Sequence, residues 1–446
     1  MKCFCSRIVP AAAVLLLLSA ARTWAESPAP SMDVPKAIFN YMERPEPEFR
    51  WENLGEKKFP GLGVVQHLKL TSQTWQNLTW QHDLMVYEPE GLKITDHMLL
   101  FVTGGAIGKE PKEGDIQQGL LLAKLCGARV ATIHQVPNQP LFGDRFEDDL
   151  ITETWLKYLA TGDETWPLLF PMVKSAVKAM DALQQFAEQD RKTKVTGFVI
   201  TGASKRGWTS WLTPVVDPRI VGTAPIVIDT LNFPAQMKYQ KETWGAYSEQ
   251  IADYTSKGLV KEETEPKTER EDRLWHMMDP YTYRKQLTLP KLLIVGTNDR
   301  YWTVDAMRMY YDDLVGPRAV LAAPNVGHNL GDRKAFALTT LAVFFRHAAT
   351  GRPLPGVTWK FDKTPAEVRL DVVADQMPVN VRHWSAESPS FDFRESKWSP
   401  TEVETPTPKF HVLRAIPAGK NVATFVELEY EHDGTVYSLT TQVFRN

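Results

Sequence analysis

The stretch VTGFVITGASKRGW, which runs from Val195 to Trp208, decides how the rest of the sequence is interpreted. It begins with a run rich in β-branched residues, which predicts a strand buried on both faces. The run stops at a small-residue turn around Ser204, and a helical segment follows. A serine on a tight turn from a strand to a helix is typical of a nucleophile elbow, in which backbone strain projects the hydroxyl above the sheet. Because N–H groups at a helix start stabilise an oxyanion, the stretch predicts an acyl-transfer site.

The turn differs from the usual elbow pattern G-x-S-x-G. It reads GASKRG over residues 202–207, so the second glycine, Gly207, comes one position later than usual. The same sequence is compatible with an ordinary strand-to-helix turn in which Ser204 caps the helix. The turn alone leaves both interpretations open.

The beginning of the chain has the composition of a targeting segment. The sequence has 446 residues and a formal net charge of −3. Lys2 and Arg7 precede an apolar run, and Thr23-Trp24-Ala25 offers a small-residue cleavage site. This predicts a signal peptide over 1–25 and a secreted or periplasmic protein that has no membrane span after cleavage. The acidic balance gives no indication of a nucleic-acid partner.

The next segments predict an α/β domain. Residues 26–62 are rich in proline and charge and predict an extended lead-in. Over residues 63–350, apolar runs alternate with segments of helical periodicity, including a predicted helix over 304–314. Strands separated by helices imply parallel crossovers, so we predict a mostly parallel sheet with helices on both faces, as in an α/β hydrolase.

Two further segments stand apart from this alternation. Residues 229–289 are rich in Trp, Tyr, Met and charge, and predict a helical cap over the strand ends, where ligands bind. A surface insertion with a small core of its own fits the same composition. Residues 357–446 contain short alternating strands, which predict a small C-terminal β-sandwich-like domain after a proline-containing hinge at 351–356.

The expected partners of Ser204 follow it in the order that an α/β hydrolase requires. In that fold the acid and then the histidine lie at the carboxyl ends of later strands. Asp299 follows the buried run 292–296, and His328 follows the run 320–323. We therefore predict that His328 removes the Ser204 proton and that Asp299 orients the imidazole.

Other residues complete or compete for this site. Asp229 follows the strand after the elbow and Asp305 lies one turn beyond Asp299, so both remain alternative acids. The expected oxyanion donors are the backbone N–H of Lys205 and those of Gly105 and Ala106, in the glycine loop after the strand 97–102. The histidines lack metal-ligand spacing and no phosphate-binding glycine loop is present, so no metal or cofactor is expected.

Several stretches of the chain carry a family resemblance: HQVPNQP (134–140), the elbow through Trp208, IVIDTLN (226–232), GTND (296–299) with YDDL (311–314), and PNVGH (324–328). Taken together, they resemble the PhoPQ-activated pathogenicity-related protein family, within the α/β-hydrolase superfamily. The resemblance implies an exported protein with a serine-hydrolase-like site and a β-rich tail. The elbow also looks like that of glucuronoyl esterases, in which the acid can lie at the position of Asp229.

The sequence thus predicts an exported serine hydrolase that cleaves an ester or amide, with a peptide, a carbohydrate ester or an acyl ester as substrate. We expect substrate contacts from Gln135 and Asn138 in the first family stretch, and from Trp208 and Trp244. The alternative is a binding or signalling protein that retains the fold without turnover, because fold alone does not imply activity. The oligomeric state is not indicated.

Overall fold

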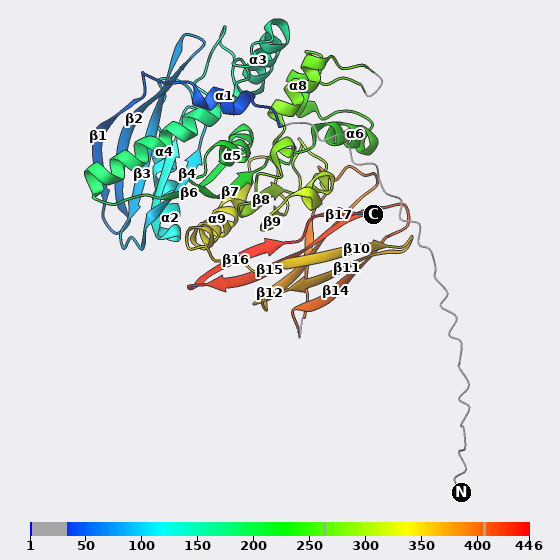
Figure 1. The fold of residues 1–446 in the computed structure, drawn as a ribbon. Coiled ribbons are helices and arrows are strands. Elements are labelled where there is room, and N and C mark those ends of the chain that lie inside the picture. Colours follow the sequence, from blue (N-terminus) through cyan, green and yellow to red (C-terminus); the bar gives the residue numbers. More distant parts are fainter. Residues whose placement is uncertain (2–33, 263–264, 405–406) are drawn as a thin grey trace. The chain divides into compact units, whose positions relative to one another are not determined.

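The computed structural model describes Met1 and residues 34–262, 265–404 and 407–446 (Figure 1). The predicted signal peptide and the beginning of the predicted lead-in lie outside this part of the chain. Residues Pro35–Asn446 form one compact unit.

A long mixed sheet is the centre of this unit. Its strand order is β1-β2-β3-β5-β4-β6-β7-β8-β9-β16-β15-β12-β13, and β17 pairs with β15. The five pairings from β5 to β9 are parallel, and the other pairings are antiparallel. The strands of the first part are Arg50–Phe59 (β1), Gly63–Trp75 (β2), Leu78–Pro89 (β3), Ile94–Val102 (β4), Ala128–Ile133 (β5), Gly197–Ala203 (β6), Ile220–Ile226 (β7), Lys291–Gly296 (β8) and Arg318–Ala323 (β9).

Helices cover both faces of the parallel strands. The pair α2 and α9 packs on one face, and the pair α4 and α5 packs on the other (Figure 1). These helices and the others before the cap are Ala37–Glu43 (α1), Glu113–Cys126 (α2), Glu147–Thr161 (α3), Leu169–Arg191 (α4), Lys205–Val216 (α5) and Lys334–Ala349 (α9). Between β7 and β8 the chain forms Phe233–Trp244 (α6), Glu249–Ile251 (η1), Ala252–Thr255 (α7), Glu269–Met278 (α8) and Pro280–Tyr283 (η2).

The strand order reverses at β4, and this reversal positions the site. The chain passes from β4 to β5 on one side and returns to β6 on the other. Ligands of open α/β sheets bind at the carboxyl ends of the strands beside such a switch point. The antiparallel β3, the reversal at β4 and the strand–turn–helix at β6 constitute the α/β-hydrolase fold, so the predicted fold class is confirmed.

The C-terminal strands continue this sheet and add a second one. Thr440 of β16 pairs with Val320 of β9, which joins the two parts. A separate antiparallel sheet packs its inner side chains, such as Leu370, into the same hydrophobic core as Leu321 and Leu428. The predicted regions 63–350 and 357–446 therefore share one sheet and one core. The C-terminal strands are Val357–Lys363 (β10), Glu367–Ala374 (β11), Asn380–Ser388 (β12), Ser399–Glu402 (β13), Lys409–Ala415 (β14), Asn421–His432 (β15), Thr435–Thr440 (β16) and Phe444–Arg445 (β17).

Two sequence predictions are wrong. The extended lead-in expected at 26–62 contains α1 and β1 in its described part. β1 is an exposed, charged edge strand, so it lacks the alternating apolar residues that reveal a half-buried strand. The helix expected over 304–314 is replaced by two 3₁₀ turns, Ala306–Met309 (η3) and Tyr311–Asp313 (η4). Tyr310 lies between these turns with a φ of −153°, which a helix does not allow. Its hydroxyl donates a hydrogen bond to Asp229, a long-range contact that local sequence does not reveal.

A buried ion pair attaches the segment around α1 to helix α4. Lys174 on α4 is 1% exposed, and its Nζ lies 2.6 Å from Glu46 Oε1. The same ammonium donates to the carbonyl oxygens of Tyr41 and Arg44, at 3.2 and 2.6 Å. Burial lowers the pKa of Lys174, and Glu46 opposes that shift.

We expect Lys174→Met to lower the free energy of unfolding by about 3–5 kcal/mol, because it leaves the Glu46 carboxylate buried without its partner. Lys178→Met is the matched control, since Lys178 lies on the same helix in a more exposed pair with Asp181. It should cost no more than about 1 kcal/mol. Chemical denaturation of both variants measures the difference, and equal losses would contradict the assigned role of the buried pair.

Candidate active site

Ser204 lies in a strained turn between β6 and α5. Its φ is 57° and its ψ is −127°, a backbone conformation that costs on the order of 1–3 kcal/mol for a residue with a side chain. The turn is held by the Ser204 N–H, which donates to the Ile226 carbonyl at 2.9 Å, and by the Ser204 carbonyl, which accepts from the Trp208 N–H at 2.9 Å. This is the geometry of a nucleophile elbow.

Arg206 shows how the elbow functions with its second glycine one position late. The guanidinium makes two bonds of 2.7 Å to Glu147 and donates to the Val136 carbonyl at 2.6 Å, so the side chain is directed away from the turn. The close packing instead falls at Gly207, where a Cβ would lie 2.7 Å from Ile228 Cγ2. Glycine is therefore required at position 207, because a larger residue would collide with Ile228, just beyond the end of β7.

His328 is paired with Asp299. Its Nδ1 lies 2.8 Å from Asp299 Oδ2. An ionised carboxylate can only accept, so Nδ1 carries a proton, and in the neutral imidazole Nε2 then has a free lone pair. This Nε2 is buried and has no hydrogen-bond partner within the described residues. The other Asp299 oxygen accepts from the Tyr301 N–H at 2.9 Å, which fixes the carboxylate.

The loops that carry these two residues are in direct backbone contact. The Asn298 N–H donates to the Val326 carbonyl at 3.0 Å, and the Thr297 N–H donates to Ala323 at 3.0 Å. A Cβ at Gly296 would lie 2.5 Å from the Val326 oxygen, so a larger residue would push the loops apart. Gly296 thus permits the approach of His328 to Asp299.

The alternative acids make other contacts. Asp229 is fully buried and accepts from the Tyr310 hydroxyl at 2.6 Å. Burial raises the pKa of Asp229 to about 7, although the hydrogen bond from Tyr310 opposes the shift. Asp305 pairs with Arg445 at 3.1 Å and accepts from the Tyr239 hydroxyl. Within the described part of the chain, Asp299 is the carboxylate in contact with His328.

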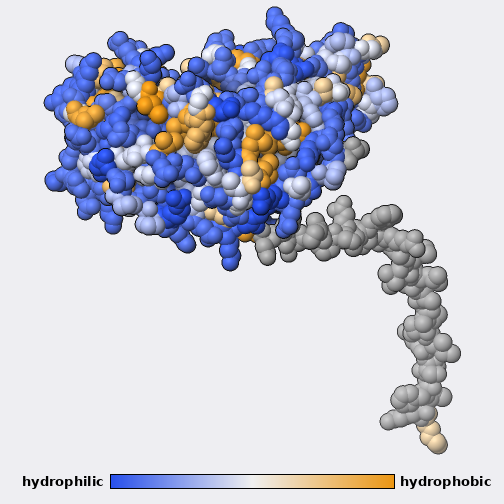
Figure 2. Space-filling view, turned by 90° about the horizontal axis from the view of Figure 1, so that it is seen from above, coloured by the Kyte–Doolittle hydropathy of each residue, from blue (hydrophilic) through white to orange (hydrophobic). Residues whose placement is uncertain are grey.

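Ser204 opens into an apolar pocket beneath the cap. Polar lining is limited to Ser204 itself, Asp148, Lys205 and Thr230, apart from the polar ends of aromatic side chains. From above, the surface carries hydrophobic residues in recesses between hydrophilic ones (Figure 2). The main aromatic walls of the pocket are Trp155, Trp208, Phe233, Tyr254, Trp275 and Tyr301.

The charge of Lys205 is compensated inside this pocket. Its buried ammonium lies 2.8 Å from Glu147 and 3.3 Å from Asp148. Burial alone would raise the pKa of Glu147, but Arg206 and Lys205 outweigh burial and hold that pKa well below its usual range. Asp148 also accepts from the hydroxyl of Tyr301 at 3.2 Å. The pocket therefore combines apolar walls with an internally neutralised charge cluster.

Trp208 and Lys205 are the other predicted residues that line the pocket with Ser204. The backbone N–H of Lys205 lies in the first helical turn, where N–H groups have no partner within the helix. Gly105 lines a neighbouring cavity instead, and Ala106 is absent from the lining of the Ser204 pocket. Their expected oxyanion role stays a prediction.

Three residues that we expected to contact the substrate, Gln135, Asn138 and Trp244, have partners within the protein. Gln135 bonds Asp83, with its Nε2 at 2.7 Å from a carboxylate oxygen. Asn138 exchanges two hydrogen bonds with the backbone of Gln81, and so braces the edge of β3. Trp244 lies beneath the guanidinium of Arg394, 4.2 Å from the ring centroid, and is not among the residues that line the pocket.

Sequence reasoning missed Tyr301 and Asp148. The Tyr301 ring lies 4.3 Å from the His328 ring, and its hydroxyl reaches Asp148. Burial raises the pKa of Tyr301 and the Asp148 carboxylate adds to the shift, so the phenol stays a neutral donor. The aromatic pair Tyr301-Trp302, which begins two residues after Asp299, was the available signal for Tyr301. No local pattern links Asp148 to residues more than fifty positions away.

The described residues form neither a cluster of metal ligands nor a membrane-spanning helix. No group of three or more His, Cys, Asp or Glu side chains there is arranged to hold a metal ion. None of the helices in the same ranges combines the length and apolarity needed to cross a membrane.

The strand order, with the strained Ser204 after β6 and the paired Asp299 and His328 after β8 and β9, defines the class as an α/β-hydrolase-fold protein. Comparison with known sequences gives the family. The chain belongs to the PhoPQ-activated pathogenicity-related protein family, whose profile matches residues 38–394.

The chain is also similar to individual known proteins. Autocrine proliferation repressor protein A of Dictyostelium discoideum is 29% identical over 94% of this chain and 88% of its own length. Among solved structures, an acetyl xylan esterase from Paenibacillus sp. R4 is 12% identical, with a TM-score of 0.49 over 70% of this chain and 91% of that one. A glucuronoyl esterase from Solibacter usitatus is also 12% identical, with a TM-score of 0.45 over 70% of this chain and 92% of that one.

The raised pKa of Asp229 predicts a pH-dependent effect on stability. Below about pH 4 the carboxyl is protonated in both the folded and the unfolded chain, so it contributes no difference. Between about pH 4 and 7 the unfolded chain loses this proton first, so the stability that Asp229 contributes falls as the pH rises. Asp229→Asn removes this loss because an amide does not titrate, and the amide oxygen can still accept the hydrogen bond from Tyr310.

We therefore expect Asp229→Asn to gain free energy of unfolding relative to the natural chain as the pH rises from 4 to 7, by up to about 4 kcal/mol, with a constant difference above pH 7. Denaturant unfolding of both proteins across this range measures it. A difference that does not change with pH would contradict the buried, protonated carboxyl.

Proposed function

We propose that this protein is an exported serine hydrolase that cleaves an ester or amide through an acyl-enzyme on Ser204. The supporting observation is the combination of a strained serine at a helix start with a histidine whose Nδ1 is held by Asp299 and whose Nε2 has no partner among the described residues. Export is proposed from the signal-like composition of residues 1–25.

The proposed reaction has two halves, the acylation and the deacylation of Ser204, and His328 transfers a proton in both. His328 Nε2 takes the Ser204 proton as the hydroxyl oxygen attacks the substrate carbonyl carbon, and Asp299 stabilises the resulting imidazolium. The Lys205 N–H stabilises the oxyanion. The tetrahedral intermediate collapses with loss of the leaving group, which takes the proton from His328. Water, activated by the same histidine, then releases the acyl group from Ser204.

The pocket favours an uncharged, apolar acyl group. Its charged lining residues, Asp148 and Lys205, are paired with each other. An acidic substrate would need a free cation in the pocket, and an amine would need a free carboxylate. An apolar acyl group needs neither, and its burial against the aromatic walls is favourable in free energy. We therefore propose an ester of an apolar acid as the preferred substrate.

A fluorophosphonate probe tests the nucleophile directly. We expect stable labelling of the natural chain, and loss of labelling in Ser204→Ala and His328→Ala, because the probe requires an activated serine. Intact-mass measurement gives the extent of labelling. Absence of labelling in protein shown to be folded would contradict the proposal.

Comparison of two isosteric variants tests the acid. Asp299→Asn should lower kcat for an activated ester by about 10³- to 10⁴-fold, because it removes the carboxylate that holds the His328 tautomer. Asp229→Asn should retain kcat within a few fold, since Asp229 contacts Tyr310 instead. The opposite ranking would assign the acid to Asp229.

A series of p-nitrophenyl esters tests the acyl preference. From acetate to hexanoate, kcat/KM should rise by about 4-fold for each methylene that the pocket buries, at about 0.8 kcal/mol each. An ester of the same length whose acyl chain ends in a carboxylate should be a poorer substrate. A flat series, or preference for the charged ester, would contradict the apolar assignment while leaving Ser204 as the nucleophile.

A binding or signalling role is the second candidate. It is favoured by the relative named as a repressor of proliferation, which matches nearly the whole chain. In that case Ser204→Ala, added to the cells or medium in which the natural chain acts, would retain its full effect although labelling is lost.

A further inference from the structure

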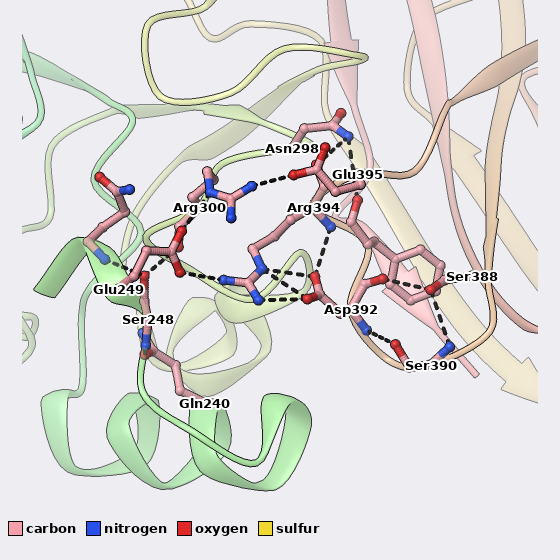
Figure 3. Close-up of polar contacts among 12 residues, drawn as sticks. Gln240, Ser248, Glu249, Asn298, Arg300, Ser388, Ser390, Asp392, Arg394 and Glu395 are labelled. Carbon is pink, nitrogen blue, oxygen red and sulfur yellow. Dashed lines mark hydrogen bonds and ion pairs between the residues drawn. The ribbon is translucent and has the colours of Figure 1, made fainter.

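The loop between β12 and β13, residues 389–398, connects the C-terminal region to the candidate active site. We call it the bridging loop. It follows Ser388, and its bend is fixed by internal hydrogen bonds: the Ser388 hydroxyl donates to the Asp392 carbonyl at 2.6 Å, and Asp392 binds both the N–H and the guanidinium of Arg394 (Figure 3). The loop therefore has a defined shape before any contact with the site is considered.

Two aromatic side chains anchor the bridging loop. Phe393 and Trp398 are each 1% exposed. They belong to a hydrophobic cluster with Trp384 and Phe425 of the C-terminal strands and with Ala322 of β9. Because β9 leads directly into the loop of His328, the anchor and the candidate site are attached to the same strand.

The bridging loop binds the residue beside the acid. Asn298 precedes Asp299, and its Nδ2 donates to the carbonyl oxygens of Ser396 at 2.7 Å and Arg394 at 3.1 Å (Figure 3). The Asn298 Oδ1 in turn accepts from the Thr297 hydroxyl at 2.9 Å. Both ends of this amide are used, so the chain beside Asp299 is held by a loop of the C-terminal region.

The same loop binds the chain that leads to the histidine. Asn325 lies three residues before His328 and exchanges two hydrogen bonds with the backbone of Trp398: Nδ2 donates to its carbonyl at 2.9 Å, and Oδ1 accepts from its N–H at 2.8 Å. The Asn325 N–H also donates to the Thr297 hydroxyl at 3.0 Å. The acid loop, the histidine loop and the bridging loop thus form one connected network.

Two arginines extend the network to the cap. Arg394 of the bridging loop and Arg300 of the acid loop both bind Glu249 in η1, at 2.8 and 2.6 Å (Figure 3). Arg300 also pairs with Glu395. These ion pairs are largely exposed, so each contributes little stability. The part-buried amide contacts of Asn298 and Asn325 are the ones that connect the bridging loop to the site.

We infer that the bridging loop is a positioning element for the candidate catalytic pair, and that Asn298 and Asn325 hold Asp299 and His328 at hydrogen-bonding distance. Neither asparagine lines the Ser204 pocket. The inference rests on the proposed function for its kinetic consequence, but the alignment of His328 with Asp299 is measurable without turnover. The C-terminal region is then part of the active apparatus although it supplies no group to the reaction.

The test uses Asn298→Ala and Asn325→Ala in the full chain, with Asn380→Ala as the matched control. Asn380 lies on β12 and caps the neighbouring N–H of Val381, away from both loops. The first readout is the downfield ¹H NMR signal of the His328 Nδ1 proton, assigned by its loss in His328→Gln. The second is the rate of labelling by the fluorophosphonate.

We expect both loop variants to lose or broaden the Nδ1 signal and to label about 10- to 100-fold more slowly, because a displacement near 1 Å is enough to cause such a loss. Asn380→Ala should match the natural chain in both readouts. If a variant only lowered the fraction of folded protein, the total amount of labelled protein would fall. The folded fraction would still show the Nδ1 proton signal and would label at the natural rate. If Asn298→Ala does not fold, Asn298→Ser, whose side chain is too short to reach the carbonyls of Arg394 and Ser396, replaces it.

An unchanged signal and an unchanged rate in folded loop variants would overturn the positioning role while Ser204 remains the nucleophile. A signal that depends on the asparagines in a natural chain that does not label would contradict the hydrolase proposal and support the positioning role. The two failures are therefore distinguishable.

Discussion

The candidate site depends on the backbone contact between the loops that follow β8 and β9. Parallel neighbouring strands bring their carboxyl ends to the same edge, but they leave the following loops free to diverge. Here the N–H groups of Thr297 and Asn298 bond the carbonyls of Ala323 and Val326, and Gly296 leaves room for that approach. The hydrogen bond of His328 to Asp299 is a consequence of this contact. The strained serine follows a third strand of the same sheet, β6.

The charged side chains on the two sides of Ser204 have different kinds of partner. On one side, Lys205 and Arg206 project from the first turn of α5, but Glu147 and Asp148 neutralise them. On the other side, Asp299 is the single carboxylate bonded to the imidazole among the described residues. The side chain of Lys205 is therefore part of the charge-paired wall of the pocket.

The extent to which the sequence predicted this arrangement follows from the range of the interactions involved. The buried strands, the elbow and the order of serine, acid and histidine depend on local periodicity and turns, so they were predictable. The choice among Asp229, Asp299 and Asp305 was not, because all three lie at or beyond strand ends and only contact with His328 separates them. The ion pair of Arg206 with Glu147 and the amide bonds of Asn298 connect distant segments, and no spacing in the sequence reveals them.

The most direct measurement for this account is the mass of the protein quenched in acid during turnover of p-nitrophenyl hexanoate. The account predicts a hexanoyl adduct on the peptide that contains Ser204, formed in a burst of nitrophenol release and absent from Ser204→Ala. Steady turnover by folded protein without an adduct or a burst, or an adduct on another residue, would contradict the assignment of Ser204 as the nucleophile.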